Sequence, residues 1–97
     1  MKTRRLLVEH GVTGFAREFP LEWNGRVYRF DFAFPASRTI LETNGRRWHD
    51  DATDYEHDQE KWSVPGRCGY RIVFATWGKV TRRPSELIGE LGATLAA

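Results

Sequence analysis

The chain has 97 residues, the usual size of one domain, and 40% hydrophobic with 29% charged residues is an ordinary globular composition. Its single cysteine, Cys68, excludes an internal disulfide and a cysteine-rich zinc site and is compatible with a reducing cytoplasm, where we expect the protein. No apolar run is long enough for a signal peptide or a membrane span, so no membrane partner is expected.

The first elements in chain order are a helix and a hairpin. Residues 4–11 (RRLLVEHG) predict a short helix that ends at Gly11. Residues 15–23 (FAREFPLEW) are weakly strand-like, and Pro20 favours an edge position. The dipeptide at 24–25 (NG) then predicts a hairpin turn.

The clearest strand is residues 26–34 (RVYRFDFAF). Its alternation predicts that Asp31 lies on the face opposite the aromatic side chains. The aromatic residues expected on one face are Tyr28, Phe30, Phe32 and Phe34. After a turn, residues 38–43 (RTILET) predict the next strand, followed by a second NG dipeptide at 44–45.

The second half of the chain predicts helix, strand, helix. Residues 53–56 (TDYE) match a capping box with Thr53 as the N-cap, and the helix should end or bend at 64–66 (VPG). Its inward face is predicted to hold Tyr55, Asp58, Gln59 and Trp62. Residues 70–77 (YRIVFATW) are typical of a buried central strand, and Pro84 begins the last helix.

The predicted order of elements is therefore αβββαβα. Three antiparallel strands are followed by a fourth that is reached through a helical crossover. This order predicts an α/β fold with a mixed four-stranded sheet flanked by helices around one core.

Two carboxylates of this sheet form the first candidate site. Asp31 lies among phenylalanines, where burial without a partner is costly, and Glu42 lies near the end of the next strand. Because the two strands run side by side, Asp31 and Glu42 are expected to converge. Carboxylate oxygens suit Mg²⁺ (or Mn²⁺), and a metal held there polarises a phosphodiester for hydrolysis. The alternative is a half-exposed Asp31 or a salt bridge between Asp31 and an arginine.

Three polar residues extend this site. Asn44 lies two residues beyond Glu42 and so faces the same way on an extended strand, although NG alone indicates only a turn. His49 is suited to general acid–base work near a carboxylate pair, although a lone His on a polar loop is usually just solvated. Asp58 is expected to point inward and to need a partner.

The basic residues indicate a polyanionic partner. Twelve of the fifteen basic residues are arginine, which makes bidentate phosphate contacts, although GC-rich genomes also favour arginine. Trp48 is suited to stack on bases or to insert between them. The arginine pairs that bracket the acidic segment at 50–60 are Arg46, Arg47, Arg82 and Arg83.

The whole motif set resembles a known pattern. The segments FDFAF, LETNGRRWH, an inward aspartate on a helix, GYRIVFATW and VTRRP resemble a bacterial family of small domains. That family is related to the very-short-patch-repair (Vsr) endonucleases of the PD-(D/E)XK restriction-endonuclease-like superfamily. The resemblance runs from Val27 to the C-terminal helix and implies one nuclease domain over residues 1–97 with a restriction-endonuclease-like core.

The resemblance implies a role for each matching residue. Asp31 and Glu42 would hold the metal, with the backbone carbonyl of Thr43 as a further ligand. His49 would be the general base, completed by Asp58. The remaining roles fall to Trp48 as the aromatic that inserts into the duplex, to Asn44 at the superfamily's lysine position, and to Lys61 as a substitute source of that charge.

The function implied is a Mg²⁺-dependent DNA endonuclease or nickase of the DNA-repair type, with arginines positioning the phosphates. A homodimer would be needed to cut both strands. An alternative is a catalytically silent DNA-binding module of an antitoxin or abortive-infection type protein, favoured by Asn44 and by Thr3 at the place where relatives carry a glutamate. That same departure would also fit an N-terminally truncated chain. RNA is a third substrate class that the same metal site can cut.

Overall fold

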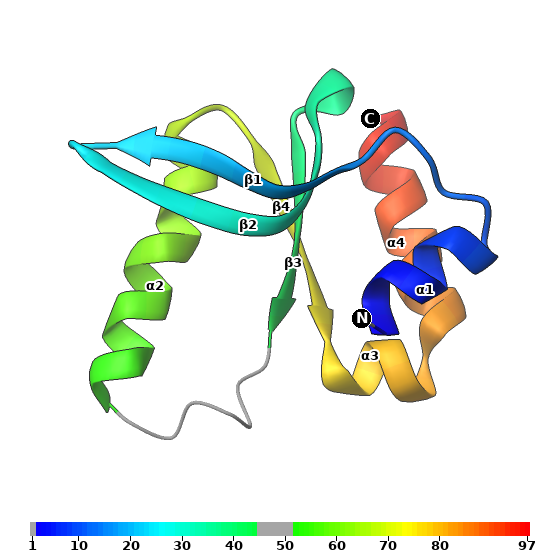
Figure 1. The fold of residues 1–97 in the computed structure, drawn as a ribbon. Helices are drawn as coiled ribbons and strands as arrows, with labels where there is room; N and C mark the ends of the chain where they lie inside the picture. Colours follow the sequence, from blue (N-terminus) through cyan, green and yellow to red (C-terminus); the bar gives the residue numbers. More distant parts are fainter. Residues whose placement is uncertain (1, 45–51) are drawn as a thin grey trace.

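The computed structural model describes residues 2–44 and 52–97, and for residues 44 and 52–58 it describes the main chain only. Four strands form one mixed sheet in the order β1-β2-β3-β4 (Figure 1). The β1–β2 and β2–β3 pairs are antiparallel and the β3–β4 pair is parallel. The strands are β1 (Ala16–Trp23), β2 (Arg26–Phe34), β3 (Thr39–Asn44) and β4 (Arg71–Thr76).

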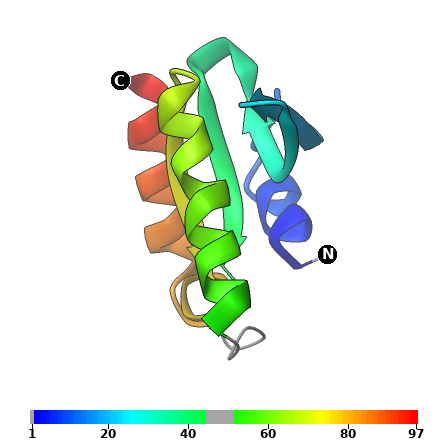
Figure 2. The same ribbon diagram turned by 90° about the vertical axis from the view of Figure 1, so that its left-hand side faces the viewer.

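The helices cover both faces of this sheet. Helix α2 (Ala52–Arg67) makes the crossover from β3 to β4 and lies on one face, and Figure 2 looks onto it with the strands behind. The helices on the other face are α1 (Lys2–Glu9), α3 (Trp77–Arg82) and α4 (Pro84–Ala96), while a short 3₁₀ turn, η1 (Pro35–Ser37), joins β2 to β3. The predicted α/β fold with a mixed, helix-flanked sheet is confirmed.

The local signals explain why these elements begin and end where they do. Asn24 and Gly25 both have positive φ angles, 53° and 78°, as a tight two-residue hairpin turn requires. Helix α1 ends before Gly11, whose φ is 69°. Pro84 is the first residue of α4, as predicted.

The core has two parts, one on each face of the sheet. On the α2 side, Ile40 packs with Val64 of α2. On the other side, Leu41 packs with Leu7 of α1 and Leu87 of α4. Because consecutive β3 residues point to opposite faces, the sheet is the wall shared by both parts.

The expectation that the aromatic residues of β2 share one face was wrong. Tyr28 and Phe30 belong to the α2 side of the core, whereas Phe32 and Phe34 belong to the α1/α4 side. The change of face occurs at Asp31, which has no partner in the β1–β2 register although its neighbours Phe30 and Phe32 do. The residue opposite is Glu18, whose φ of 50° breaks the regular alternation of the strand.

Strand β4 also differs from its prediction. It is the last strand in the sheet order, not a central one, and only Val73 and Ala75 within it are buried. Its final predicted residue, Trp77, instead begins α3, a short helix that the pattern did not indicate. The hydroxyl of Thr76 accepts a bond from the Lys79 N–H at 3.2 Å and caps this helix.

Helix α2 is longer than predicted at both ends. It begins at Ala52, before the predicted N-cap Thr53, and continues through Pro65 to Arg67. The Cys68 and Tyr70 N–H groups donate to the Pro65 carbonyl at 3.0 and 2.7 Å and complete the last turn. Gln59, predicted to face inward, is exposed, whereas Val64 and Pro65 are buried. Among the described residues no helix has the length and apolar character needed to cross a membrane.

Candidate active site

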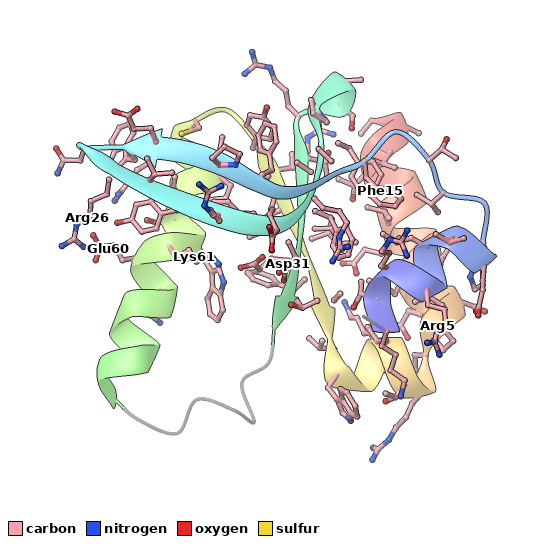
Figure 3. All side chains as sticks on the ribbon, viewed as in Figure 1. Arg5, Phe15, Arg26, Asp31, Glu60 and Lys61 are labelled. Atoms are coloured by element: carbon pink, nitrogen blue, oxygen red, sulfur yellow. The ribbon has the colours of Figure 1, made fainter. Side chains whose placement is uncertain are left out.

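Asp31 and Glu42 meet where β2 and β3 part. The β2–β3 register ends at the Phe32–Leu41 pair, and Asp31 and Glu42 are the next two residues opposite one another. There the carboxylates replace main-chain partners: the Asp31 N–H donates to Glu42 Oε1 at 2.9 Å, and the Thr43 N–H donates to Asp31 Oδ2 at 3.0 Å. The Thr43 hydroxyl donates to the same Asp31 oxygen. We call this point the fork, and Figure 3 shows Asp31 at it.

The fork exists because both ladders of β2 are interrupted at Asp31. On one side the β1 pairing skips the Glu18–Asp31 position, and on the other the β3 pairing has already ended. Beyond this point β2 leaves with the hairpin, while β3 continues beside β4 as far as Asn44. The expected convergence of Asp31 and Glu42 is therefore present, and side chains hold it together.

Lys61 of α2 brings a positive charge to the fork. Its Nζ lies 2.7 Å from Glu42 Oε2 and 5.1 Å from the centre of the Phe30 ring. Glu42 is only 3% exposed, so its carboxylate is removed from water on the same face of the sheet as Ile40 and α2. An ion pair in such surroundings is far less screened by solvent than a surface pair.

Burial raises the pKa of Glu42, because a charged carboxylate loses hydration inside the protein. The hydrogen bonds from Lys61 and from the Asp31 N–H act in the opposite direction, and the nearby charge of Asp31 raises the pKa further. Glu42 is thus a carboxyl whose charge depends on the cation beside it.

The oxygen atoms of the fork are suited to a hard cation. Asp31 Oδ2 accepts two hydrogen bonds from Thr43. Its other carboxylate oxygen, Oδ1, has no hydrogen bond within the described part of the chain. Glu42 Oε2 already faces a cation, the Lys61 ammonium. Carboxylate and carbonyl oxygens are the donors that Mg²⁺ prefers, so these residues fit that ion. The described residues hold no group of three or more His, Cys, Asp or Glu side chains that could share one metal.

The other predicted site residues of this half of the chain are described only in part. Arg46, Arg47, Trp48 and His49 lie outside the described residues. Asn44 ends β3 opposite Thr76. The main chain of Asp58 lies in α2, three residues or about one turn before Lys61.

No hydrogen bond or ion pair between described residues joins Arg82 or Arg83 to Asp31 or Glu42. Arg82 ends α3 on the α1/α4 side of the sheet, and Arg83 forms a surface ion pair with Glu86 at 3.7 Å.

Five further residues near the site were not predicted to belong to it. Tyr28 donates its hydroxyl to Glu60 at 3.1 Å, and Arg26 lies 4.0 Å from the same carboxylate. Trp62 stacks edge-on against Phe74, with ring centres 5.2 Å apart, on the strand beside Glu42. The sequence signals near these contacts were the predicted inward face of α2, which includes Asp58 and Trp62, and the aromatic pattern of β2, which includes Tyr28.

No protein-family model and no solved structure matches the chain. Two uncharacterized proteins from two strains of Mycobacterium tuberculosis are each 25% identical to it over 95 residues, which cover 97% of this chain and 35% of each relative. The chain therefore spans about a third of the length of the curated relatives it matches. It is similar to a part of these longer proteins.

Proposed function

We propose that the chain is a divalent-metal-dependent nuclease domain of the PD-(D/E)XK type, related to the Vsr endonucleases, that hydrolyses phosphodiester bonds in DNA. One observation carries the proposal: two carboxylates, Asp31 and Glu42, are held together at an interrupted strand pair with an ammonium group beside them. Two neighbouring carboxylates away from water are unfavourable without positive charge, and the single ammonium group of Lys61 balances only one of them.

The residues of the fork divide the work between them. Asp31 and Glu42 would hold the cation, together with the carbonyl oxygen of Thr43 on the same strand end. A divalent cation bound there supplies positive charge to the scissile phosphate and lowers the pKa of the attacking water. The hydrogen bonds from Thr43 fix the Asp31 carboxylate in place, so its orientation does not have to be established when substrate arrives.

Lys61 supplies the charge that the superfamily draws from a lysine two residues after its second acid, a place that Asn44 occupies here. In the structure Lys61 neutralises Glu42 Oε2. Glu42 would hold the cation, and the Lys61 ammonium group beside it would contact a phosphate oxygen and stabilise the negative charge of the transition state. His49, oriented by Asp58, is proposed to take the proton from water.

The test is conversion of supercoiled plasmid to nicked or linear DNA in Mg²⁺ or Mn²⁺. Asp31→Asn keeps the size of the side chain but removes its charge, and we expect cleavage to fall by at least about 100-fold. Glu86→Gln is the matched control, because this exposed carboxylate lies on α4 away from the fork and its loss should leave cleavage unchanged. Activity that persists in Asp31→Asn would mean that the fork is not the site.

A second candidate function is a catalytically silent DNA-binding module. It is favoured by the same Lys61–Glu42 contact, because an acid already neutralised by lysine needs no metal. Calorimetric titration with Mn²⁺ separates the two functions. Binding that disappears in Asp31→Asn supports the nuclease, whereas no binding to the wild-type protein supports the silent module.

A further inference from the structure

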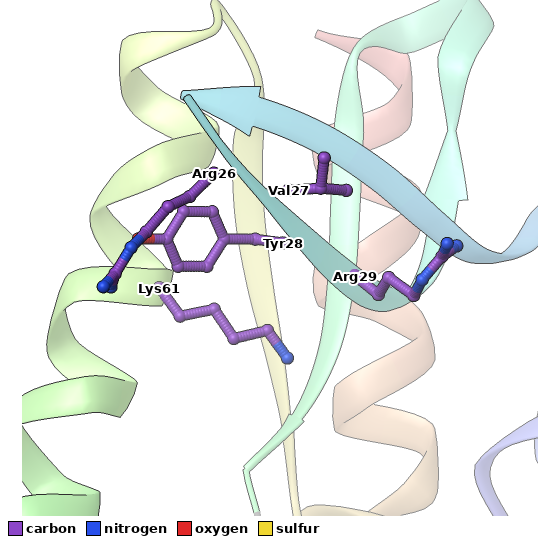
Figure 4. A pocket seen from close by; sticks show the side chains of 5 residues that line it. All are labelled: Arg26, Val27, Tyr28, Arg29 and Lys61. Carbon is purple, nitrogen blue, oxygen red and sulfur yellow. The ribbon is translucent and has the colours of Figure 1, made fainter. Parts of the chain in front are cut away.

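A groove runs along the edge of β2 that faces away from β1. It has a volume of about 510 Å³ and is lined by Arg26, Val27, Tyr28 and Arg29 of β2 and by Lys61 of α2. Figure 4 shows Arg26 and Tyr28 extending from β2 toward α2, Lys61 extending from α2 below the strand, and Arg29 further along the strand. We call it the hairpin groove.

The groove is open because β2 has a partner on one edge only. From Arg26 to Phe30, β2 pairs with β1, but its pairing with β3 begins only at Phe32. In a strand, N–H and C=O groups point alternately to the two edges. Along the described strands, the second edge of this segment therefore carries main-chain donors that no other strand uses, and donors of that kind bind phosphate oxygens.

The side chains of the groove select an anion. Among the described side chains, its lining contains three cations and no Asp or Glu. Arg29 is exposed and forms no ion pair with any described residue, and Arg26 is 67% exposed with only a 4.0 Å contact to Glu60. Glu60 lies beside the groove, where its carboxylate accepts the Tyr28 hydroxyl. Val27 is 59% exposed. Its apolar side chain can contact the sugar of a nucleic-acid backbone, whereas a small inorganic anion offers it no apolar surface.

The groove leads to the fork. Lys61 lines the groove and also contacts Glu42 Oε2 at 2.7 Å, and Asp31 follows Arg29 by two residues on β2. The distance along β2 from Arg26 to Asp31 is about 17 Å. That is the axial length of about five nucleotides of one strand in B-DNA. A strand lying in the groove would thus bring a phosphate to the two carboxylates.

We propose that the hairpin groove binds the phosphodiester backbone of the DNA strand next to the scissile phosphate. This proposal rests on the proposed nuclease function for the identity of the polymer. Arg26 on the α2 face of β2 and Arg29 on its other face contact phosphates of this backbone, so they contribute affinity without reading sequence. The recognition surface then includes the β1–β2 hairpin.

The test measures binding without cleavage. Anisotropy of a fluorescein-labelled DNA duplex in EDTA compares the wild-type protein with the double variant Arg26→Gln/Arg29→Gln. We expect a Kd increase on the order of 10-fold and a salt dependence of log Kd that is less steep by about two. The matched control is Arg4→Gln/Arg5→Gln, which removes the same charge from exposed positions on α1, at the opposite side of the molecule from Arg26 (Figure 3).

The outcomes separate this proposal from the nuclease function. Weaker binding in the groove variant but not in the α1 variant supports the groove, whether or not the wild-type protein cuts DNA. Equal losses in both variants would mean that only net charge matters and would overturn it. Unchanged binding in the groove variant would also overturn it, as expected if this edge instead accepts a strand from another protein, and wild-type cleavage would remain as evidence for the nuclease. A wild-type protein that binds no DNA would overturn the groove as well.

Discussion

Burial and the neighbouring groups of Glu42 act in opposite directions on the pKa of its carboxyl group. Removing a carboxylate from water disfavours its charged form, while Lys61 and the Asp31 N–H favour it. Lys61 is itself only 23% exposed, so neither partner of the pair is fully hydrated. Loss of one partner should therefore cost more than the loss of a surface ion pair.

Lys61→Met tests this balance. Without the ammonium group the pKa of Glu42 should rise further, so the folded protein binds a proton that the unfolded chain has already released. A carboxyl with a raised folded-state pKa contributes stability at low pH that is lost as the pH rises from its ordinary value, about 4.3, through the raised one. We expect the variant to lose about 2 kcal/mol at pH 7 and less near pH 4, measured by urea unfolding across this range.

Lys79→Met is the matched control for that experiment. Lys79 forms an equally short ion pair, 2.8 Å from Glu90, but the Glu90 side chain is 44% exposed. Its loss should cost less than about 1 kcal/mol and add no steep pH dependence above pH 4. Equal pH profiles for the two variants would contradict the role given to the burial of Glu42.

At the scale of elements, the β1–β2 hairpin projects from the sheet and forms one wall of the groove. Its turn was predicted from two residues, Asn24 and Gly25, because only a few residue types accept the positive φ angles that a tight hairpin needs. The change of face at Asp31 had no such signal. It lies opposite a left-handed Glu18 on the paired strand, a conformation that no residue preference predicts for glutamate.

Gly25→Ala should destabilise the hairpin by about 1 kcal/mol, because alanine is strained at a φ of 78° even though its Cβ meets no atom within 4 Å. Gly89→Ala, in α4, is the control: its backbone is not left-handed and its added Cβ is equally free of contacts. That change should stabilise the protein by up to about 1 kcal/mol. Thermal and urea unfolding measure both, and the same sign for the two changes would refute the turn assignment.

At the scale of the whole molecule, two core parts share one sheet. Ile40 and Leu41 are neighbours in β3, yet each packs into a different part. A disturbance on one face must therefore be felt through β3 on the other. The α1/α4 side and the α2 side should unfold together, which keeps the fork intact as long as the protein is folded.

Leu7→Ala tests this coupling. Leu7 is fully buried on the α1/α4 side, and its truncation should cost about 3 kcal/mol. Far-UV circular dichroism and the fluorescence of a variant in which Trp62 is the one remaining tryptophan should still report one coincident urea transition, since Trp62 lies on the α2 side. Val8→Ala, on the same helix but at a residue 56% exposed, should shift the midpoint little. Separate transitions for the two probes would mean that the two core parts unfold independently.

The sequence by itself determined the order of the strands and of the helices other than η1 and α3, the first hairpin turn and the mixed sheet. These features follow from local preferences and hydrophobic periodicity. It also indicated that Asp31 and Glu42 lie on neighbouring strands. Only the tertiary structure decided that both ladders of β2 stop at Asp31 and that Lys61 reaches Glu42 from α2. The hairpin groove, too, is visible only in the tertiary structure. Contacts between segments distant in the chain depend on how elements pack and not on the pattern within any one of them.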